Sequence, residues 1–253
     1  MKKLVLAYSG GLDTSYCVKY LTKEKGFEVH AVSINTGGFS SDEIAEIKEK
    51  ALALGASTYT SVNAVKSYYE NVIKYLIFGN VLRNNTYPLS VSAERIVQAI
   101  EIAKYSKKID ASYIAHGSTG AGNDQVRFDS IFQIMAPETE IITPIRDQQL
   151  AREEEIEYLK AEGIDMNWEK AKYSINKGLW GTSVGGDETL TSDLPLPDSA
   201  YPSQLVEKGT EKIKLSFDQG EFVALNDQAD TPVSNIEKLN TLASKYAIGR
   251  DVH

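Results

Sequence analysis

Strand-like and helix-like stretches alternate from residue 3 to residue 162, and this alternation constrains the fold more than any other feature. Apolar or β-branched runs with strand character are followed by runs with helical spacing. Strands that alternate with helices predict a parallel sheet covered on both faces, a doubly wound α/β fold. The expected strands are 3–8, 27–34, 57–62, 112–116 and 140–143, and the expected helices are 13–25, 41–54, 64–77, 92–105, 123–134 and 150–162. The helix over 41–54 is expected to begin with a serine cap at Ser41.

The chain of 253 residues exceeds the usual size of one domain, so a main domain with a smaller second one is expected. Its composition, 42% hydrophobic and 25% charged, is ordinary for a globular protein. Aromatic residues, glycines and prolines become frequent after residue 163, which predicts domains over 1–165 and 166–253. We expect ordered but irregular structure over 163–210, then a hairpin around Gly220 and a helix over 234–246.

The charge and cysteine content narrow the class of protein. The net charge is −8 and the sequence shows no basic cluster, so we expect no nucleic-acid partner. Cys17 is the single cysteine, which rules out an intramolecular disulfide and a thiolate metal cluster. No run approaches 18 apolar residues and the start lacks the pattern of a signal peptide. We therefore expect a cytoplasmic protein with no membrane partner.

The first expected strand runs into the string SGGLDTS, residues 9–15, which opens the following helix. A glycine turn before a helix directs unpaired backbone amides at one point and favours a phosphate group there. Asp13 is unusual in an anion site unless it caps the helix or helps to bind a cation. The string matches neither the Walker pattern nor the GxGxxG pattern, and an ordinary strand-to-helix turn is the alternative.

A second glycine-rich turn, 117–122, follows the expected strand 112–116 and leads into GNDQVRF. Both turns follow parallel strands, so we expect them at the same edge of the sheet. Asn123 and Asp124 could receive an ammonium group, and Arg127 one turn later could receive a carboxylate, which suits an amino-acid ligand. The alternative is that Asn123 only caps the helix and Arg127 is a solvent-exposed helix residue.

Longer strings carry a resemblance to a known family. SGGLDTS resembles the pyrophosphate-binding loop of the N-type ATP pyrophosphatases. HGSTGAGNDQVRF, TYPLSVSAER and YSINKGLWGTS narrow this to the argininosuccinate synthase family, and the resemblance extends to the terminal YAIGRDVH. It implies an adenine nucleotide alpha hydrolase-like, Rossmann-like domain followed by an α+β synthetase domain. The sequence is short for the family, so we expect the second domain to be incomplete, as in a protein truncated at its carboxyl terminus.

The family's reaction is the ATP-dependent ligation of L-citrulline and L-aspartate to argininosuccinate, in arginine biosynthesis and the urea cycle. The resemblance implies a citrullyl-adenylate, with AMP and pyrophosphate as products and Mg²⁺ accompanying ATP. The family forms homotetramers, an assembly that a truncated protein is not expected to complete.

The resemblance also implies roles for individual residues. Those expected to bind ATP are Ala7, Tyr8, Ser9, Gly10, Gly11, Leu12, Asp13, Thr14, Ser15, Ile34 and Gly117. Aspartate would be held by Thr119, Asn123 and Asp124, with Asp124 orienting its amine. Citrulline would be held by Tyr87, Ser92, Asn123, Arg127, Ser174 and Ser183. No residue is assigned as a general acid or base, and none as a direct metal ligand.

Several of these residues have purely structural alternatives. Tyr87 precedes Pro88 and could simply pack a turn, and Ser174 and Ser183 could be turn serines. Trp180, His116 and Cys17 are expected to be structural. Two rival functions remain, a tRNA thiolase, which would need reactive cysteines and a basic surface, and a non-catalytic ATP-binding or assembly protein.

Overall fold

The computed structural model describes residues 2–166, 173–191 and 193–250. The protein forms two compact units, one of residues 1–64 with 92–171, the other of residues 65–91 with 172–253. The expected domain boundary at 165/166 adjoins residues 167–172, which lie outside the described residues, and it stays a prediction. The last three residues of the string YAIGRDVH also lie outside them.

The first unit is built on a five-stranded, all-parallel sheet with the strand order β3-β2-β1-β4-β5. This confirms the predicted doubly wound α/β fold. The order reverses direction between β1 and β4, which places a topological switch point at their carboxyl ends. The strands are β1 (Lys3–Ala7), β2 (Glu28–Asn35), β3 (Thr58–Asn63), β4 (Tyr113–Ala115) and β5 (Glu140–Ile142).

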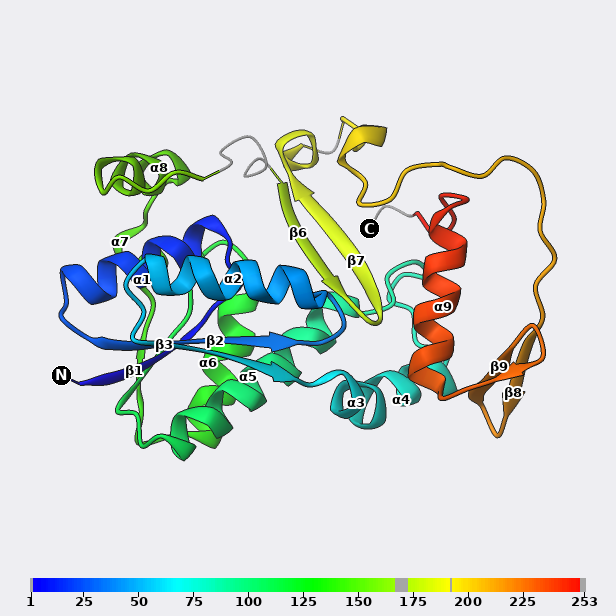
Figure 1. The fold of residues 1–253 in the computed structure, drawn as a ribbon, viewed down its shortest axis with the longest axis horizontal. Coiled ribbons are helices and arrows are strands. Elements are labelled where there is room, and N and C mark those ends of the chain that lie inside the picture. Colours follow the sequence, from blue (N-terminus) through cyan, green and yellow to red (C-terminus); the bar gives the residue numbers. More distant parts are fainter. Residues whose placement is uncertain (1, 167–172, 192, 251–253) are drawn as a thin grey trace. The chain divides into compact units, whose positions relative to one another are not determined.

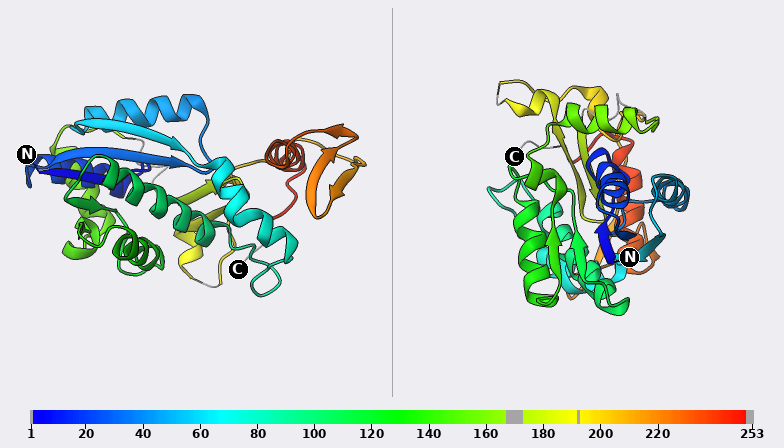
Figure 2. Two further views of the ribbon diagram at one scale, coloured as in Figure 1. Left: turned by 90° about the horizontal axis from the view of Figure 1, so that it is seen from below. Right: turned by 90° about the vertical axis from the view of Figure 1, so that its left-hand side faces the viewer.

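Helices cover both faces of this sheet (Figures 1 and 2). The helices α1 (Leu12–Lys23) and α2 (Ser41–Ala53) lie on one face. On the other face lie α5 (Ser90–Lys108) and α6 (Asp124–Met135). After β5 come a short helix that was not predicted, α7 (Pro144–Gln148), and then α8 (Arg152–Ala161), which packs against α1.

The core of this unit explains why β1 is an uninterrupted apolar run. Leu4, Val5 and Leu6 are all fully buried, because helices cover the strand from both sides. Cys17 of α1 is also fully buried, as predicted, and burial raises the pKa of its thiol well above the usual value.

The start of α2 differs from the prediction by one residue. Ser40, not Ser41, is the N-cap, and its hydroxyl accepts a hydrogen bond from the backbone amide of Glu43. The Glu43 carboxylate accepts one in return from the amide of Ser40, which completes a capping box. The two adjacent serines made the cap ambiguous in the sequence.

In the second unit, the helix predicted over 64–77 is broken into three pieces. A turn of α3 (Val65–Tyr68) leads into a π-helical segment, Tyr69–Ile73, and then into α4 (Lys74–Phe78). The polar loop that follows turns sharply at Asn84 and Asn85, both with positive φ.

The expectation of irregular structure after residue 163 is wrong for residues 173–186. They form an antiparallel hairpin of β6 (Tyr173–Gly178) and β7 (Gly181–Gly186) with a two-residue turn. Small polar residues and glycines dominate both strands, so no apolar alternation indicated them. Short 3₁₀ turns follow at Asp187–Leu190 and Asp198–Ala200.

The predicted hairpin around Gly220 is confirmed as β8 (Leu215–Asp218) and β9 (Glu221–Leu225), to which β10 (Gln228–Ala229) adds a third strand. The last helix, α9 (Pro232–Ser244), begins two residues before its predicted start. Thr231 caps it and Pro232 occupies its first position. Over the described residues, none of the helices has the length and apolar character that crossing a bilayer requires.

Candidate active site

The loop after β1 presents backbone amides at the carboxyl edge of the sheet. Gly11 is the N-cap of α1, and no side chain makes a capping hydrogen bond to this helix. The first intrahelical hydrogen bond runs from the Ser15 amide to the Gly11 carbonyl oxygen at 3.0 Å. The amides of Leu12, Asp13 and Thr14 therefore precede the helical hydrogen-bond pattern, which is the arrangement that favours a phosphate group. Asp13 does not cap the helix.

Hydroxyl groups fix the shape of this loop. Ser9 Oγ lies 3.2 Å from Thr14 Oγ1 and accepts a hydrogen bond from the Gly11 amide at 3.3 Å. Ser15 Oγ donates to the Gly11 carbonyl oxygen at 2.6 Å, and Ser33 Oγ of β2 donates to the Tyr8 carbonyl oxygen at 2.7 Å. Gly10 has a φ of +78°, in the region that favours glycine.

The two glycine-rich turns lie side by side, as predicted. A Cβ placed on Gly117 would lie 3.3 Å from Cβ of Asp13 and 3.3 Å from Cγ2 of Thr14. Only a glycine leaves the second turn this close to the start of α1 without displacing it. Ile34, another expected ATP residue, is buried near the end of β2, the neighbour of β1.

A series of polar groups around the buried His116 holds the second turn. His116 is 1% exposed, and its Nδ1 accepts a hydrogen bond from the Ser118 amide at 3.2 Å. Its Nε2 therefore carries the proton and donates to Asp129 at 2.9 Å. Arg146 also donates to Asp129, at 2.6 Å. The hydrogen bond from His116 and the bond from Arg146 lower the pKa of the Asp129 carboxyl. His116 thus has the structural role that was predicted.

The residues expected to bind amino acids follow this turn. Thr119 and Asn123 are exposed, and Asn123 is the N-cap residue of α6, although its side group does not cap the helix. Asp124 accepts hydrogen bonds from two guanidinium groups, that of Arg127 at 2.6 Å and that of Arg95 at 3.0 Å. Arg127 is therefore part of a charge cluster and not a merely solvated helix residue.

Asp13 pairs with a second carboxyl group. It interacts with the carboxyl group of Glu155 of α8, which is 2% exposed. Burial, and after it the proximity of Asp13, raises the pKa of Glu155 well above its ordinary value, and burial also raises that of Asp13. Two carboxyl groups this close favour retention of a proton by the pair.

Comparison with known proteins gives a consistent result. Residues 3–165 match the family model described as the arginosuccinate synthase N-terminal HUP domain. The chain belongs to the argininosuccinate synthase family. It is 39% identical to an argininosuccinate synthase of Methanocaldococcus jannaschii over 97% of its own length, and 38% identical to one of Sulfurisphaera tokodaii over 99%. These matches span 62% and 64% of the two relatives, so less than two thirds of their length is represented.

In this member of the argininosuccinate synthase family, the citrulline residues expected from the resemblance are divided between the units. Ser92 of α5 belongs to the first unit, together with Asn123 and Arg127. Tyr87, Ser174 and Ser183 belong to the second.

The two serines lie in the strands of the β6–β7 hairpin and are not turn residues. Asn176 is paired with Ser183, and Ser174 is two residues before Asn176, so all three share one face. Tyr87 closes a tight loop through backbone hydrogen bonds with Arg83. Trp180, at the hairpin turn, donates to the Pro88 carbonyl oxygen at 2.8 Å, which fits the structural role expected for it.

Several polar residues around the family's motifs were not predicted from the sequence. Arg95 holds Asp124, and the buried Glu94 accepts a hydrogen bond from Thr36 Oγ1 at 2.8 Å. Lys50 of α2 donates to the Gly10 carbonyl oxygen at 2.5 Å. Arg95 could have been noticed, because it lies one helical turn after Ser92. No local pattern indicates Lys50, whose partner is forty residues away in the sequence.

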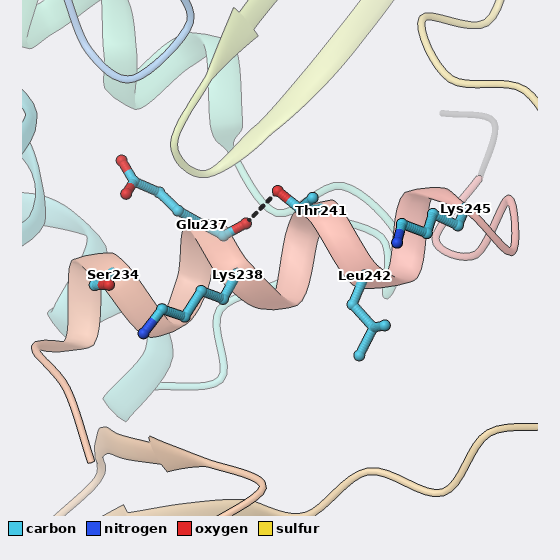
Figure 3. Close-up of a pocket in the computed structure, with 6 residues that line it drawn as sticks. All are labelled: Ser234, Glu237, Lys238, Thr241, Leu242 and Lys245. Atoms are coloured by element: carbon cyan, nitrogen blue, oxygen red, sulfur yellow. Dashed lines mark hydrogen bonds between the residues drawn. The ribbon is translucent and has the colours of Figure 1, made fainter. Parts of the chain in front are cut away.

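Elsewhere the described residues offer little that suits nucleotide chemistry. They contain no cluster of three or more His, Cys, Asp or Glu side chains that could hold a metal ion. An open depression lies along one side of α9 (Figure 3). Its residues are engaged in ordinary helix contacts, such as the hydrogen bond from Thr241 Oγ1 to the Glu237 carbonyl oxygen at 2.9 Å. The lining residues are Ser234, Glu237, Lys238, Thr241, Leu242 and Lys245.

Proposed function

We propose that this protein performs the catalytic chemistry of argininosuccinate synthase, the ATP-dependent ligation of L-citrulline and L-aspartate. One observation carries the proposal. The amide-presenting loop over residues 9–15 and the turn that leads to Asn123, Asp124 and Arg127 meet at the switch point between β1 and β4. A phosphate-binding loop beside groups suited to amino-acid ligands is what this reaction requires.

In the first step, the amides of residues 12–14 and the hydroxyls of Ser9 and Thr14 would hold the phosphates that leave as pyrophosphate. The ureido oxygen of citrulline would attack the α-phosphorus and form the adenylate. Positioning the reactants and neutralising phosphate charge supply most of the help, so no general acid or base is required. Mg²⁺ would enter with ATP on its phosphate oxygens, because Asp13 is already paired with Glu155.

In the second step, the amine of aspartate would attack the activated carbon and expel AMP. Thr119, Asn123 and Asp124 are proposed to hold aspartate, and Asn123 and Arg127 to hold citrulline. Asp124 and Arg127 bind each other here, so we expect the two substrates to exchange that internal ion pair for pairs of their own. Tyr87, Ser92, Ser174 and Ser183 complete the proposed citrulline set.

The other properties implied by the family belong to the same proposal. The partners are small molecules, the location is the cytoplasm, and the homotetramer is the assembly of the complete enzyme. The net charge of −8 and a single buried cysteine argue against a tRNA thiolase.

The test is pyrophosphate release from ATP by the purified protein. Release that requires citrulline, followed by argininosuccinate formation when aspartate is added, supports the proposal. ATP binding without turnover under any substrate would instead support a non-catalytic binding protein. Release that requires RNA would support the thiolase.

A further inference from the structure

We propose that Lys50 is a positioning residue for the phosphate-binding loop, which it holds from the side opposite to the bound phosphates. The inference rests on the proposed function, because it assigns the loop to the pyrophosphate of ATP. Lys50 lies outside the sequence motifs that carry the resemblance to the family.

Helix α2 contacts the loop at two points, one helical turn apart. The Lys50 ammonium donates to the Gly10 carbonyl oxygen at 2.5 Å. Ile47 packs against the same residue, since a Cβ placed on Gly10 would lie only 3.1 Å from Cγ1 of Ile47. Gly10 is the residue of this loop with positive φ, so α2 contacts the loop at the residue whose backbone conformation favours glycine.

The direction of this hydrogen bond determines where an amide points. A trans peptide unit holds its C=O and N–H groups in opposite directions. The carbonyl oxygen of Gly10 points to Lys50 of α2, so the amide of Gly11 in the same peptide unit points away from α2. Gly11 is the N-cap of α1 and leads directly into the exposed amides of residues 12–14. Lys50 therefore fixes the orientation of the peptide that begins the anion-binding turn.

The electrostatic setting of Lys50 fits this role. Among the described residues, no ion pair within 4 Å includes the Lys50 ammonium. Lys50 lines a shallow surface depression, in which Asp165 is the acidic residue. Burial lowers the pKa of Lys50 to about 8. An ammonium bonded to this carbonyl oxygen also polarises the peptide and strengthens the Gly11 amide as a donor to Ser9 Oγ, a hydroxyl of the same loop.

The experiment compares binding of ATP, pyrophosphate and adenosine to the whole protein and its variants by calorimetry with Mg²⁺ present. Lys50→Met removes the hydrogen bond and keeps the apolar stem. Lys48→Met is the matched control, because Lys48 is an exposed lysine on the same helix. We expect K50M to weaken pyrophosphate and ATP binding about tenfold, because a loop whose first peptide is no longer held must be ordered when the phosphates bind. Adenosine binding should stay within about twofold, K48M should match wild type, and K50R should recover most of the loss.

These readouts separate a positioning role from a general effect on stability, which would weaken adenosine binding equally. Equal pyrophosphate binding by K50M and wild type overturns the inference while leaving the proposed function intact. A wild-type protein that binds neither ATP nor pyrophosphate overturns both. If K50M does not fold, Lys50→Gln is compared with Lys48→Gln in its place, with the same expected losses. Equal pyrophosphate binding by K50Q and wild type then overturns the inference.

Discussion

Asp124 has both carboxylate oxygens engaged by guanidinium groups, one from Arg127 and one from Arg95. A carboxylate held at two points is well placed to receive a third cation, the ammonium of a bound amino acid. Asp124 also keeps Arg127 in place until a substrate carboxylate takes over the position of the Asp124 carboxylate. If Asp124 and Arg127 bind the substrates as proposed, specificity depends on charge as well as on shape.

Replacing Asp124 with Asn keeps the size of the side group and removes its charge. We expect Asp124→Asn to raise the KM for aspartate about tenfold or more, the loss of a charge-assisted hydrogen bond, while KM for ATP stays within about twofold. Steady-state pyrophosphate release with each substrate varied in turn measures both values. An equal rise in both KM values would contradict the assignment of Asp124 to aspartate.

Glu155 gives a second prediction at this scale, about stability and pH. Its pKa is raised in the folded state, so its contribution to stability is fully present below the unfolded value of 4.5 and is lost as pH rises through the folded pKa. Glu155→Gln does not titrate and escapes that loss. We therefore expect the Tm of E155Q minus that of wild type to increase between pH 5 and pH 9.

Thermal unfolding at a series of pH values measures this difference. Glu153→Gln is the control, because Glu153 is an exposed acid on the same helix. A Tm difference for E155Q that is independent of pH would show that Glu155 is ionised in the folded protein at neutral pH.

Among the helices, α2 offers the clearest test, because two adjacent serines have different roles there. Ser40 makes the capping box with Glu43, whereas Ser41 is the first helical residue and is exposed. Ser40→Ala should lower the free energy of unfolding by about 1 kcal/mol, as is typical for a lost N-cap. Ser41→Ala should change it by less than about 0.5 kcal/mol, as surface substitutions usually do. Urea unfolding of the two variants checks this, and equal losses would refute the assignment of the cap.

Apart from the short helix α7, the elements of the first unit could be predicted from the sequence to within a few residues. Buried strands such as β1 are continuous apolar runs, and helices such as α1 show regular apolar spacing, so local pattern and tertiary environment agree. The β6–β7 hairpin could not be predicted, because cross-strand pairing and not residue pattern specifies it. The π-helical segment at Tyr69–Ile73 likewise has no signature in the sequence.

The two loops of the candidate site were predictable to the same extent, whereas the ligands assigned to their residues stay predictions. Glycines in turns mark their own positions, so both loops were found. The groups that hold the loops, such as Lys50, Arg146 and Glu155, belong to other elements that only the fold brings near. Their chemistry depends on burial and on partners distant in sequence, which a single sequence does not reveal.

For the molecule as a whole, a ligand that binds only the folded state stabilises it. At a hundred times its Kd, Mg-ATP should add about 2.7 kcal/mol to the free energy of unfolding. Scanning calorimetry should show a higher Tm with Mg-ATP and no change with tRNA. If the two units unfold separately, only the transition of the unit with the parallel sheet should move. A shift with tRNA alone would favour the thiolase.

Each of the two units is built from two separate segments of the polypeptide, which has consequences for folding during translation and for dividing the protein into fragments. Residues 65–91 leave the parallel-sheet unit after β3, and the polypeptide returns to it at residue 92. No single proteolytic cleavage can therefore separate the two units intact. During translation, residues 65–91 emerge before the rest of their unit and cannot pack against it until residues after 172 have been synthesised. A recombinant fragment that ends near residue 165 would contain residues 65–91 but lack residues 172–253, the rest of their unit.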